Sequence, residues 1–462
     1  MHPNQSASLL QQNRISHYAE GSDSYAFFNL LTGPDFLEKV ESLLPDHRER
    51  LFPPTETLSM FLAQAMNPDG SCQKVVNDAA VTRMLGGLTV CSTHTGSYCQ
   101  ARQRLPLEMI RQLACHTGAL MTNNSPDAWH WRGRPVRLVD GATVSMPDTE
   151  DNQLVYPQPG GQAPGLGFPI CRIVGMICLG SGALLDAATG PCKGKGSDEQ
   201  SLLRSILGTL SPNDILMGDA FYATYFLLCD LQQKGIDGIF EQQGSRRRST
   251  DFRCGKRLGK QDHLITLVKP KIKPGWMSQE EYDQARDSLV VRELRAGGKT
   301  LVTTLLDPKY ASRADLKAFY RERWHVEVDL RNIKTTLGME IVSCRTPEMV
   351  EKEIWVYLLA YNLIRLLMAQ AALLSDILPR QLSFKHTLQL WIAWLQIGNG
   401  CYNDEQLAGL FLLIAQLRVG KRPGRIEPRA VKRRPKPFPL LTKPRGEARD
   451  NVRKNGHPKK VK

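Results

Sequence analysis

Three carboxylates of this 462-residue chain stand where they could act together on a phosphodiester. Asp140 and Asp219 each follow a short apolar run that is typical of a buried strand. Strand ends lie at the rim of an α/β sheet, where ligands usually bind. Three carboxylates at such a rim can hold two Mg²⁺ ions about 3.5–4 Å apart for in-line attack on a phosphodiester. Taken singly, Asp140-Gly and Gly-Asp219 are equally typical of turns and helix caps.

The third carboxylate, Glu327, belongs to a charged segment, 315–337, that the sequence predicts as one long helix. Tyr320, Arg323 and Lys334 are spaced so that they share its helix face. The cations and the hydroxyl could then hold DNA phosphates beside a metal-bound phosphate. A solvated face with a four-residue ion pair between Arg323 and Glu327 is the structural alternative.

This spacing of Tyr, Arg, Glu and Lys resembles the signature of bacterial insertion-sequence transposases of the DDE type. The segment 140–149 resembles the first-aspartate motif of that family, and 218–222 resembles the second, although Ala220 departs from many relatives. The segment 98–105 is similar to the basic N-terminal segment of the family. The resemblance covers roughly residues 83–371.

The resemblance implies a ribonuclease-H-like core in which Asp140, Asp219 and Glu327 are the catalytic residues and bind two divalent cations, Mg²⁺ or in its place Mn²⁺. It implies an enzyme that binds the inverted-repeat ends of its element, cuts DNA with metal-activated water and joins the 3′-hydroxyl to target DNA. The resemblance also implies a homodimer in the synaptic complex and a bacterial, nucleoid-associated location. It leaves open whether cleavage passes through a hairpin intermediate. A nuclease on the same fold without strand transfer and a non-catalytic DNA-binding relative are the alternatives.

The fold class expected is a multidomain α/β protein. Helical spacing dominates the start of the chain, strand-type runs follow Trp131, and the gap between Asp219 and Glu327 is too long for one crossover. The predicted parts are a helical N-terminal DNA-binding domain (1–130), the catalytic core (131–235 and 306–375), a β-rich insertion (236–305), a helical C-terminal region (376–417) and a basic flexible tail (418–462).

Within these parts, several elements are predicted individually. The glycines at 180–182 divide the β-type run 171–187 into a hairpin, and 215–219 is a short buried strand. Segments 198–210 and 223–234 have helical spacing. Further strands are expected at 236–241, 263–268, 289–295 and 299–305, and further helices at 31–44, 55–65, 75–85, 97–105, 348–374, 388–395 and 405–417.

Several other residues are candidates for DNA contact. Arg102 and Arg104 lie on the basic helix 97–105, which could equally be the solvated face of a helical bundle. Trp276, in the predicted insertion, could stack on a base flipped out of the duplex, as the resemblance implies, or pack a small sheet. A run of three arginines could follow a phosphate backbone or form a solvated loop: Arg246, Arg247 and Arg248.

Charge is concentrated at one end of the chain, whose formal net charge is +14. Residues 418–462 hold 17 Lys and Arg against 3 Asp and Glu, a balance of +14, so the body is neutral. An all-over polycation is therefore excluded. The tail is interpreted as a sequence-independent DNA tether, or alternatively as a solubilising segment.

The remaining composition points to a globular protein of the cytoplasm. Hydrophobic residues make up 42% and charged residues 23%, which is sufficient for a real core. The most apolar stretch, 354–374, is interrupted by Asn362 and Arg365, so it is expected to be a buried helix and not a membrane span. No secretory signal is visible, and the eleven cysteines show neither a disulfide framework nor zinc spacing.

Overall fold

A computed structural model of the chain describes most of the sequence. The described residues are 42, 52–87, 90–161, 163–194, 196–244, 246, 250–397, 404–420 and 441–456. Arg247 and Arg248 lie outside these residues, and so does nearly all of the helix predicted over 31–44.

The centre of the protein is a nine-stranded mixed sheet with the order β3-β2-β1-β4-β5-β9-β8-β7-β6. In chain order the strands are β1 (Val136–Ser145), β2 (Ile170–Cys178), β3 (Leu184–Pro191), β4 (Ile215–Gly218), β5 (Asp237–Glu241), β6 (Lys256–Gly259), β7 (Asp262–Val268), β8 (Ser288–Ala296) and β9 (Lys299–Thr303). The β2–β3 hairpin turns at the glycines near 180, which confirms that prediction. β6 was not predicted.

The pairing directions divide the sheet into two parts that meet at β5. β4 pairs in parallel with both β1 and β5, whereas β2 is antiparallel to β1 and β3. From β5 outward every pair is antiparallel, beginning with β5–β9. The predicted insertion therefore extends the central sheet, and its first expected strand, 236–241, is β5, which pairs with the core strand β4.

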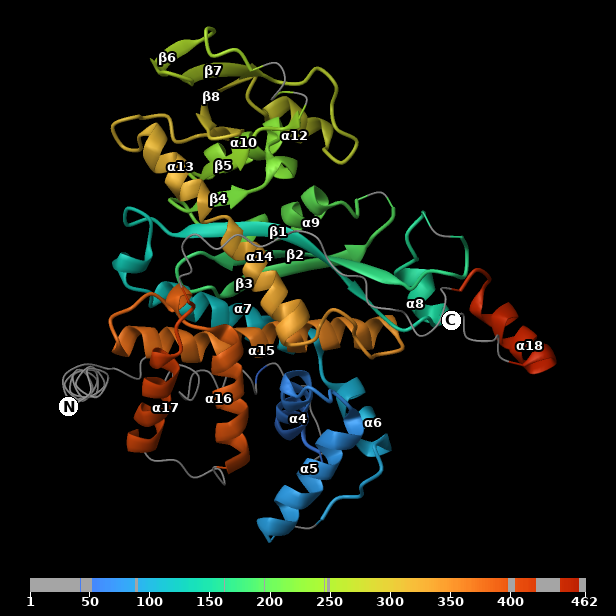
Figure 1. The fold of residues 1–462 in the computed structure, drawn as a ribbon. Coiled ribbons are helices and arrows are strands. Elements are labelled where there is room, and N and C mark those ends of the chain that lie inside the picture. Colours follow the sequence, from blue (N-terminus) through green and yellow to red (C-terminus); the bar gives the residue numbers. More distant parts are fainter. Residues whose placement is uncertain are drawn as a thin grey trace, which may run out of the picture.

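Helices cover both faces of the central strands (Figure 1). Because side chains alternate along a strand, Leu138 points into the core under one face and Val139 into the core under the other. The first core includes α7 (Leu107–Asn123) and α15 (Pro347–Leu374), and the second includes α9 (Glu199–Ile206) and α10 (Tyr225–Gln233). The catalytic candidates of β1 and β4 thus sit between two packed layers.

α15 is the structural axis of the first layer. Among the described residues it is the one helix long and apolar enough to cross a membrane, yet 89% of its most apolar window is buried inside the protein. Buried Asn362 donates hydrogen bonds to the carbonyls of Ala114 on α7 and Leu184 on β3, at 2.8 Å each. These bonds join the helix to its neighbours, so the expectation of a buried core helix is confirmed.

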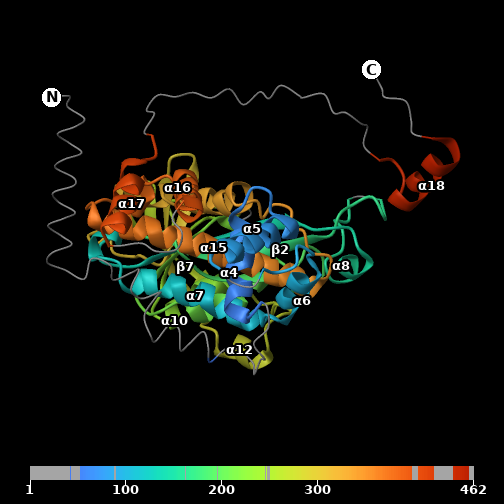
Figure 2. The same cartoon turned by 90° about the horizontal axis from the view of Figure 1, so that it is seen from below.

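The N-terminal helices α4 (Pro54–Met66), α5 (Cys72–Leu85) and α6 (Gly96–Arg104) gather beside α15, as the view from below shows (Figure 2). They share a small core of their own around Tyr98 and Val76. α7 belongs instead with the sheet, because it packs on α15 and β3.

The C-terminal region contains α16 (Phe384–Ile397) and α17 (Asp404–Gln416), which pack on α15, as predicted. The prediction of an extended or disordered tail is wrong for α18 (Arg445–Asn455). The guanidinium of Arg445 lies 4.9 Å from the ring centroid of Phe168, which ties the start of this helix to the loop after α8 (Glu150–Val155).

The helix expected over 315–337 is interrupted. α13 (Arg313–Arg321) ends in a turn at Glu322–Arg323, α14 (Trp324–Arg331) comes next, and the π-helical segment η4 (Asn332–Thr336) completes it. Backbone bonds of the i to i+3 type tighten the turn, since the N–H of Arg323 bonds Tyr320 and that of Val326 bonds Arg323. The Arg323–Glu327 ion pair still has the four-residue spacing of a helix face, whereas the Tyr320 hydroxyl is directed to the Gly218 carbonyl.

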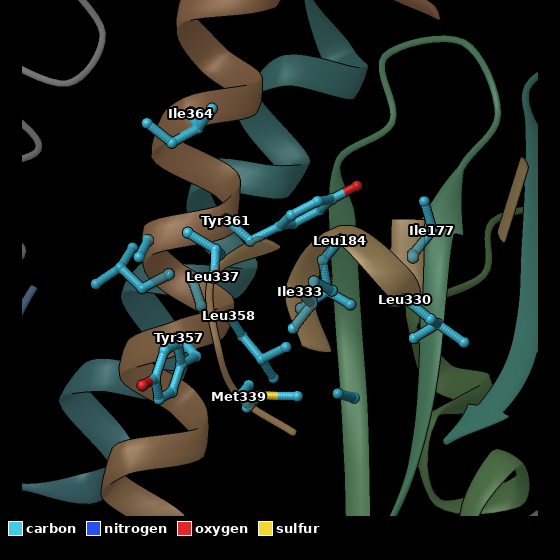
Figure 3. Packing of buried hydrophobic residues seen from close by; sticks show 14 of the residues in the cluster. Ile177, Leu184, Leu330, Ile333, Leu337, Met339, Tyr357, Leu358, Tyr361 and Ile364 are labelled. Atoms are coloured by element: carbon cyan, nitrogen blue, oxygen red, sulfur yellow. The ribbon is translucent and has the colours of Figure 1, made fainter. Parts of the chain in front are cut away.

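The π-helical segment is held between the sheet and α15 (Figure 3). Ile333 and Leu330 pack with Leu184 and Ile177 of the hairpin and with Leu358 of α15. This packing fixes the end of the helix that carries Glu327, so the site below rests on a rigid support.

Candidate active site

Asp140 lies in the middle of an unbroken strand. β1 pairs with β2 through Asp140–Gly175 and Gly141–Val174, so the Asp-Gly step is not a turn. The half-buried carboxylate of Asp140 accepts a hydrogen bond from the backbone N–H of Gly141 at 2.8 Å. Pairing with β2 before and after this step has overridden the local turn preference, and it holds this carboxylate at a fixed position on the sheet.

Asp219 begins directly after β4 and caps the 3₁₀ turn η3 (Ala220–Tyr222) by accepting a hydrogen bond from the N–H of Phe221 at 2.8 Å. Gly218 before it is closely packed, since a Cβ there would lie 2.9 Å from side-chain atoms of Val139 and Tyr222. Tyr320 is 6% exposed, and its hydroxyl donates to the Gly218 carbonyl at 3.0 Å. In this structure Tyr320 thus supports the backbone next to Asp219 and does not face solvent.

Glu327 is joined to Asp140 through Arg323. The guanidinium of Arg323 lies 2.5 Å from a carboxylate oxygen of Glu327 and 3.8 Å from one of Asp140. It is located in the turn between α13 and α14, so the break in the helix directs it at these two acids. The structure therefore brings the first and third predicted carboxylates to one cation.

A surface pocket of about 470 Å³ opens at this point. Asp140 and Glu327 line it, together with Lys334 and Arg331. Neither of these two cations has an ion-pair partner within the part of the chain that the structure describes. The pocket thus combines carboxylates with available cations, which suits a phosphate backbone lying across a metal site.

The electrostatics at Asp140 reflect its burial beside other acids. Burial raises the pKa of the Asp140 carboxyl to about 6, and the carboxylates of Asp219 and Glu199 act in the same direction. The N–H of Gly141 and the guanidinium of Arg323 oppose them. Carboxylate oxygens without His or Cys are the donors that Mg²⁺ prefers, so the residue types fit that ion.

The geometry does not itself form a metal cage. No three His, Cys, Asp or Glu side chains of the described residues are grouped closely enough to hold a metal ion. Arg323 occupies the space between Asp140 and Glu327 and satisfies both by charge. A divalent ion would therefore have to compete with this guanidinium.

Three charged residues of the pocket, Glu199, Arg331 and Glu340, were missed from the sequence. Glu199, in the first turn of α9, lines it with Asp140 and is close enough to influence the pKa of that residue. Nothing distinguishes it in sequence from an acid that stabilises a helix N-terminus. Arg331 could have been found, because it comes four residues after Glu327 on one helix face.

Arg102 and Arg104, the two candidate arginines of α6, differ in their burial. Arg102 is 7% exposed and lies over the rings of Phe61 and Tyr98, at 4.7 and 5.1 Å from their centroids. Its Nη1 donates to Gln64 at 3.3 Å. Arg104 is exposed. This placement favours a packing role for Arg102 and leaves Arg104 as the candidate for DNA contact.

Trp276 packs against α9 and α10. The guanidinium of Arg204 on α9 lies 3.8 Å from its ring centroid, and Phe226 on α10 meets it edge-on at 6.2 Å. Trp276 nevertheless stays 42% exposed. Arg246, the described member of the arginine run, has its Nε 3.2 Å from a carboxylate oxygen of buried Glu293.

These elements and this pocket agree with the family comparison. Residues 131–363 match the model of the transposase DDE domain, and the chain belongs to that family. It is 29% identical over 353 residues to the transposase InsG for insertion sequence element IS4 from Escherichia coli (strain K12), a match that spans 74% of this chain and 78% of InsG. It is also 33% identical over 143 residues to InsZ of the same organism, named as a candidate transposase, across 30% of this chain and 46% of InsZ. The chain is thus a DNA-acting transposase.

Proposed function

We propose that this chain binds the inverted-repeat ends of an insertion sequence, cleaves the DNA there and joins the 3′-hydroxyl ends to target DNA. The observation that carries the proposal is the pocket in which Asp140 and Glu327 meet beside Arg331 and Lys334. Asp219 completes the acid set, since it is near enough to raise the pKa of Asp140. The five strands β3-β2-β1-β4-β5 support a ribonuclease-H-like core, because only β2 runs against the others.

In this proposal Asp140, Asp219 and Glu327 hold two divalent cations, Mg²⁺ or Mn²⁺. When bound, these supply an activated water or 3′-hydroxyl and neutralise charge on the phosphate in the transition state. Lys334, which lines the same pocket, contacts the DNA phosphates next to the scissile one.

We assign two roles to Arg323, neutralisation of the acids and phosphate binding. Without cations it neutralises Asp140 and Glu327, which prevents two facing carboxylates from repelling each other. Once those acids are engaged, its guanidinium is free to pair with a phosphate, for which its fork geometry is suited. Tyr320 keeps the strand end that carries Asp219 in place.

Other parts of the chain would bind DNA outside the pocket. We assign Trp276, Arg104 and the arginines 246–248 to the element ends, and the tail 418–462 to sequence-independent tethering. Two copies acting on two ends would form a homodimer in the synaptic complex, working on bacterial nucleoid DNA in the cytoplasm.

The test is cleavage of a labelled duplex carrying the terminal inverted repeats that flank the coding sequence. The parent protein should cut it with Mg²⁺ and not with EDTA. Asp140→Asn, Asp219→Asn and Glu327→Gln should each lower the rate at least about 10²-fold. Asp151→Asn, which changes an exposed carboxylate on α8, is the matched control and should cut normally. Cleavage by all three site variants at the parent rate would refute the proposal.

A further inference from the structure

We propose that Glu199 contributes a fourth carboxylate to the divalent-cation site, from an element that none of the three motif acids occupies. The inference rests on the proposed function, because it takes the pocket beside Asp140 to hold a cation. It adds to that function a residue on α9, the helix between β3 and β4.

The position of Glu199 is the first support. Its side chain lines the same pocket as Asp140 and Glu327. One carboxylate oxygen accepts a hydrogen bond from the hydroxyl of fully buried Tyr222 at 3.3 Å. Tyr222 closes the turn that Asp219 begins, so the second-aspartate segment supplies both an acid and the group that orients another.

The second support is the space at Gly141. A Cβ at this position would lie 2.3 Å from Cδ of Glu199 and 2.4 and 2.7 Å from its two oxygens. Gly141 does not have a positive φ, so its backbone does not itself require glycine. The absence of a side chain there leaves room for the Glu199 carboxylate against the strand that bears Asp140.

The charges around Glu199 provide the third support. Asp140 and Asp219 are both within electrostatic reach of it, and no ion pair to Glu199 occurs in the described segments. Arg172 is a cation that acts on the Glu199 carboxyl and lowers its pKa, but its Nη1 donates to the carbonyl of Ser197 at 2.6 Å. Half-buried carboxylates gathered in this way need a further positive charge, which a divalent ion provides.

The first test is Mn²⁺ binding to the DNA-free full-length protein by calorimetry. Glu199→Gln keeps the size and the acceptor for Tyr222, and it should weaken binding about tenfold. Glu280→Gln, an exposed acid on α12 (Gln279–Gln284), is the control and should bind as the parent does. If Asp140→Asn weakens binding and Glu199→Gln does not, the inference is overturned and the proposed function stands. If neither variant weakens binding, the proposed metal site itself fails.

The second test separates the carboxylate from its surroundings. Gly141→Ala should displace the flexible end of Glu199 and weaken Mn²⁺ binding about tenfold in the parent. In a Glu199→Ala background the three atoms nearest to the added methyl are removed, so Gly141→Ala should cause no further loss. An equal loss in both backgrounds would show that position 141 acts through the strand alone, and this would contradict the inference.

Discussion

Replacing Tyr320 by Phe removes one hydroxyl that the structure places in the protein interior. This hydroxyl donates to the Gly218 carbonyl at 3.0 Å, and the residue is 6% exposed. The variant removes this donor from a carbonyl at a buried position, and the loss of such a hydrogen bond costs about 1–3 kcal/mol. We therefore expect Tyr320→Phe to lower the free energy of unfolding by about 1–3 kcal/mol, and to slow DNA cleavage because Gly218 precedes Asp219.

The chain offers a matched control in Tyr310→Phe. The Tyr310 hydroxyl is also buried, but it has no hydrogen-bond partner among the described residues, and the ring of Tyr310 meets Trp131 edge-on at 6.0 Å. Removing this hydroxyl leaves no partner unsatisfied and keeps the ring contact. Tyr310→Phe should therefore leave stability unchanged or slightly raise it.

The assay is urea-induced unfolding of the DNA-free proteins at one ionic strength, followed by tryptophan fluorescence. End-DNA affinity is measured in parallel with Ca²⁺ in place of Mg²⁺. The structure predicts a lower midpoint for Tyr320→Phe with nearly parental affinity for DNA. An unchanged midpoint together with weaker DNA binding would refute the positioning role, and it would favour the phosphate contact expected from the sequence.

Three further predictions concern charge. Asp329→Asn should lower the free energy of unfolding by about 3–5 kcal/mol in the same urea titration. Asp329 is fully buried, and its loss would leave Arg380, at 2.6 Å, without its ionic partner. Parental stability would contradict this. Arg102→Met should reduce the stability of the N-terminal helices, whereas Arg104→Met should reduce DNA affinity and leave stability unchanged. Calorimetric unfolding measures the first effect and a filter-binding assay the second. The reverse pattern would contradict the roles inferred from the burial of Arg102 and the exposure of Arg104. Deleting 418–462 should flatten the dependence of DNA affinity on salt; an unchanged slope would rule out the tether.

Most strands and helices of the core could be predicted because their apolar residues follow a clear period. The hairpin at the glycines near 180, the short strand before Asp219 and the buried helix α15 all occur where the sequence predicts them. The spacing of apolar residues along the chain is enough to show which side of each of these elements is buried. The proximity of Asp140 and Glu327 followed from the family resemblance and not from strand ends, because Asp140 lies within β1 and not at its end.

The break in the helix could not be predicted, because it depends on tertiary contacts. Residues 315–337 have continuous helical character, but Trp131 stacks on Phe319 at 4.1 Å and Tyr320 bonds the end of β4. These contacts fix α13, while the packing of Ile333 fixes η4, and the turn between them directs Arg323 to the acids. Sequence spacing alone predicts one continuous helix and does not show where it is interrupted.

The burial of Arg102 and the position of Glu199 in the pocket could not be predicted, for one common reason. Charged residues are usually exposed, so an arginine on a basic helix is read as a surface group and a glutamate at a helix start as a dipole partner. Aromatic rings and Gln64 accommodate the Arg102 guanidinium, and the missing side chain of Gly141 accommodates the Glu199 carboxylate. Both depend on partners far away in the sequence.

Strand transfer tests the central claim most directly, because it separates a transposase from a nuclease on the same fold. A labelled terminal-repeat duplex with a pre-formed 3′-hydroxyl is incubated with the full-length protein, Mg²⁺ and a supercoiled plasmid. The account predicts that the label becomes covalently joined to plasmid DNA with the parent protein and not with Glu327→Gln. Cleavage of uncut ends by the parent without any joining of pre-cut ends would contradict it.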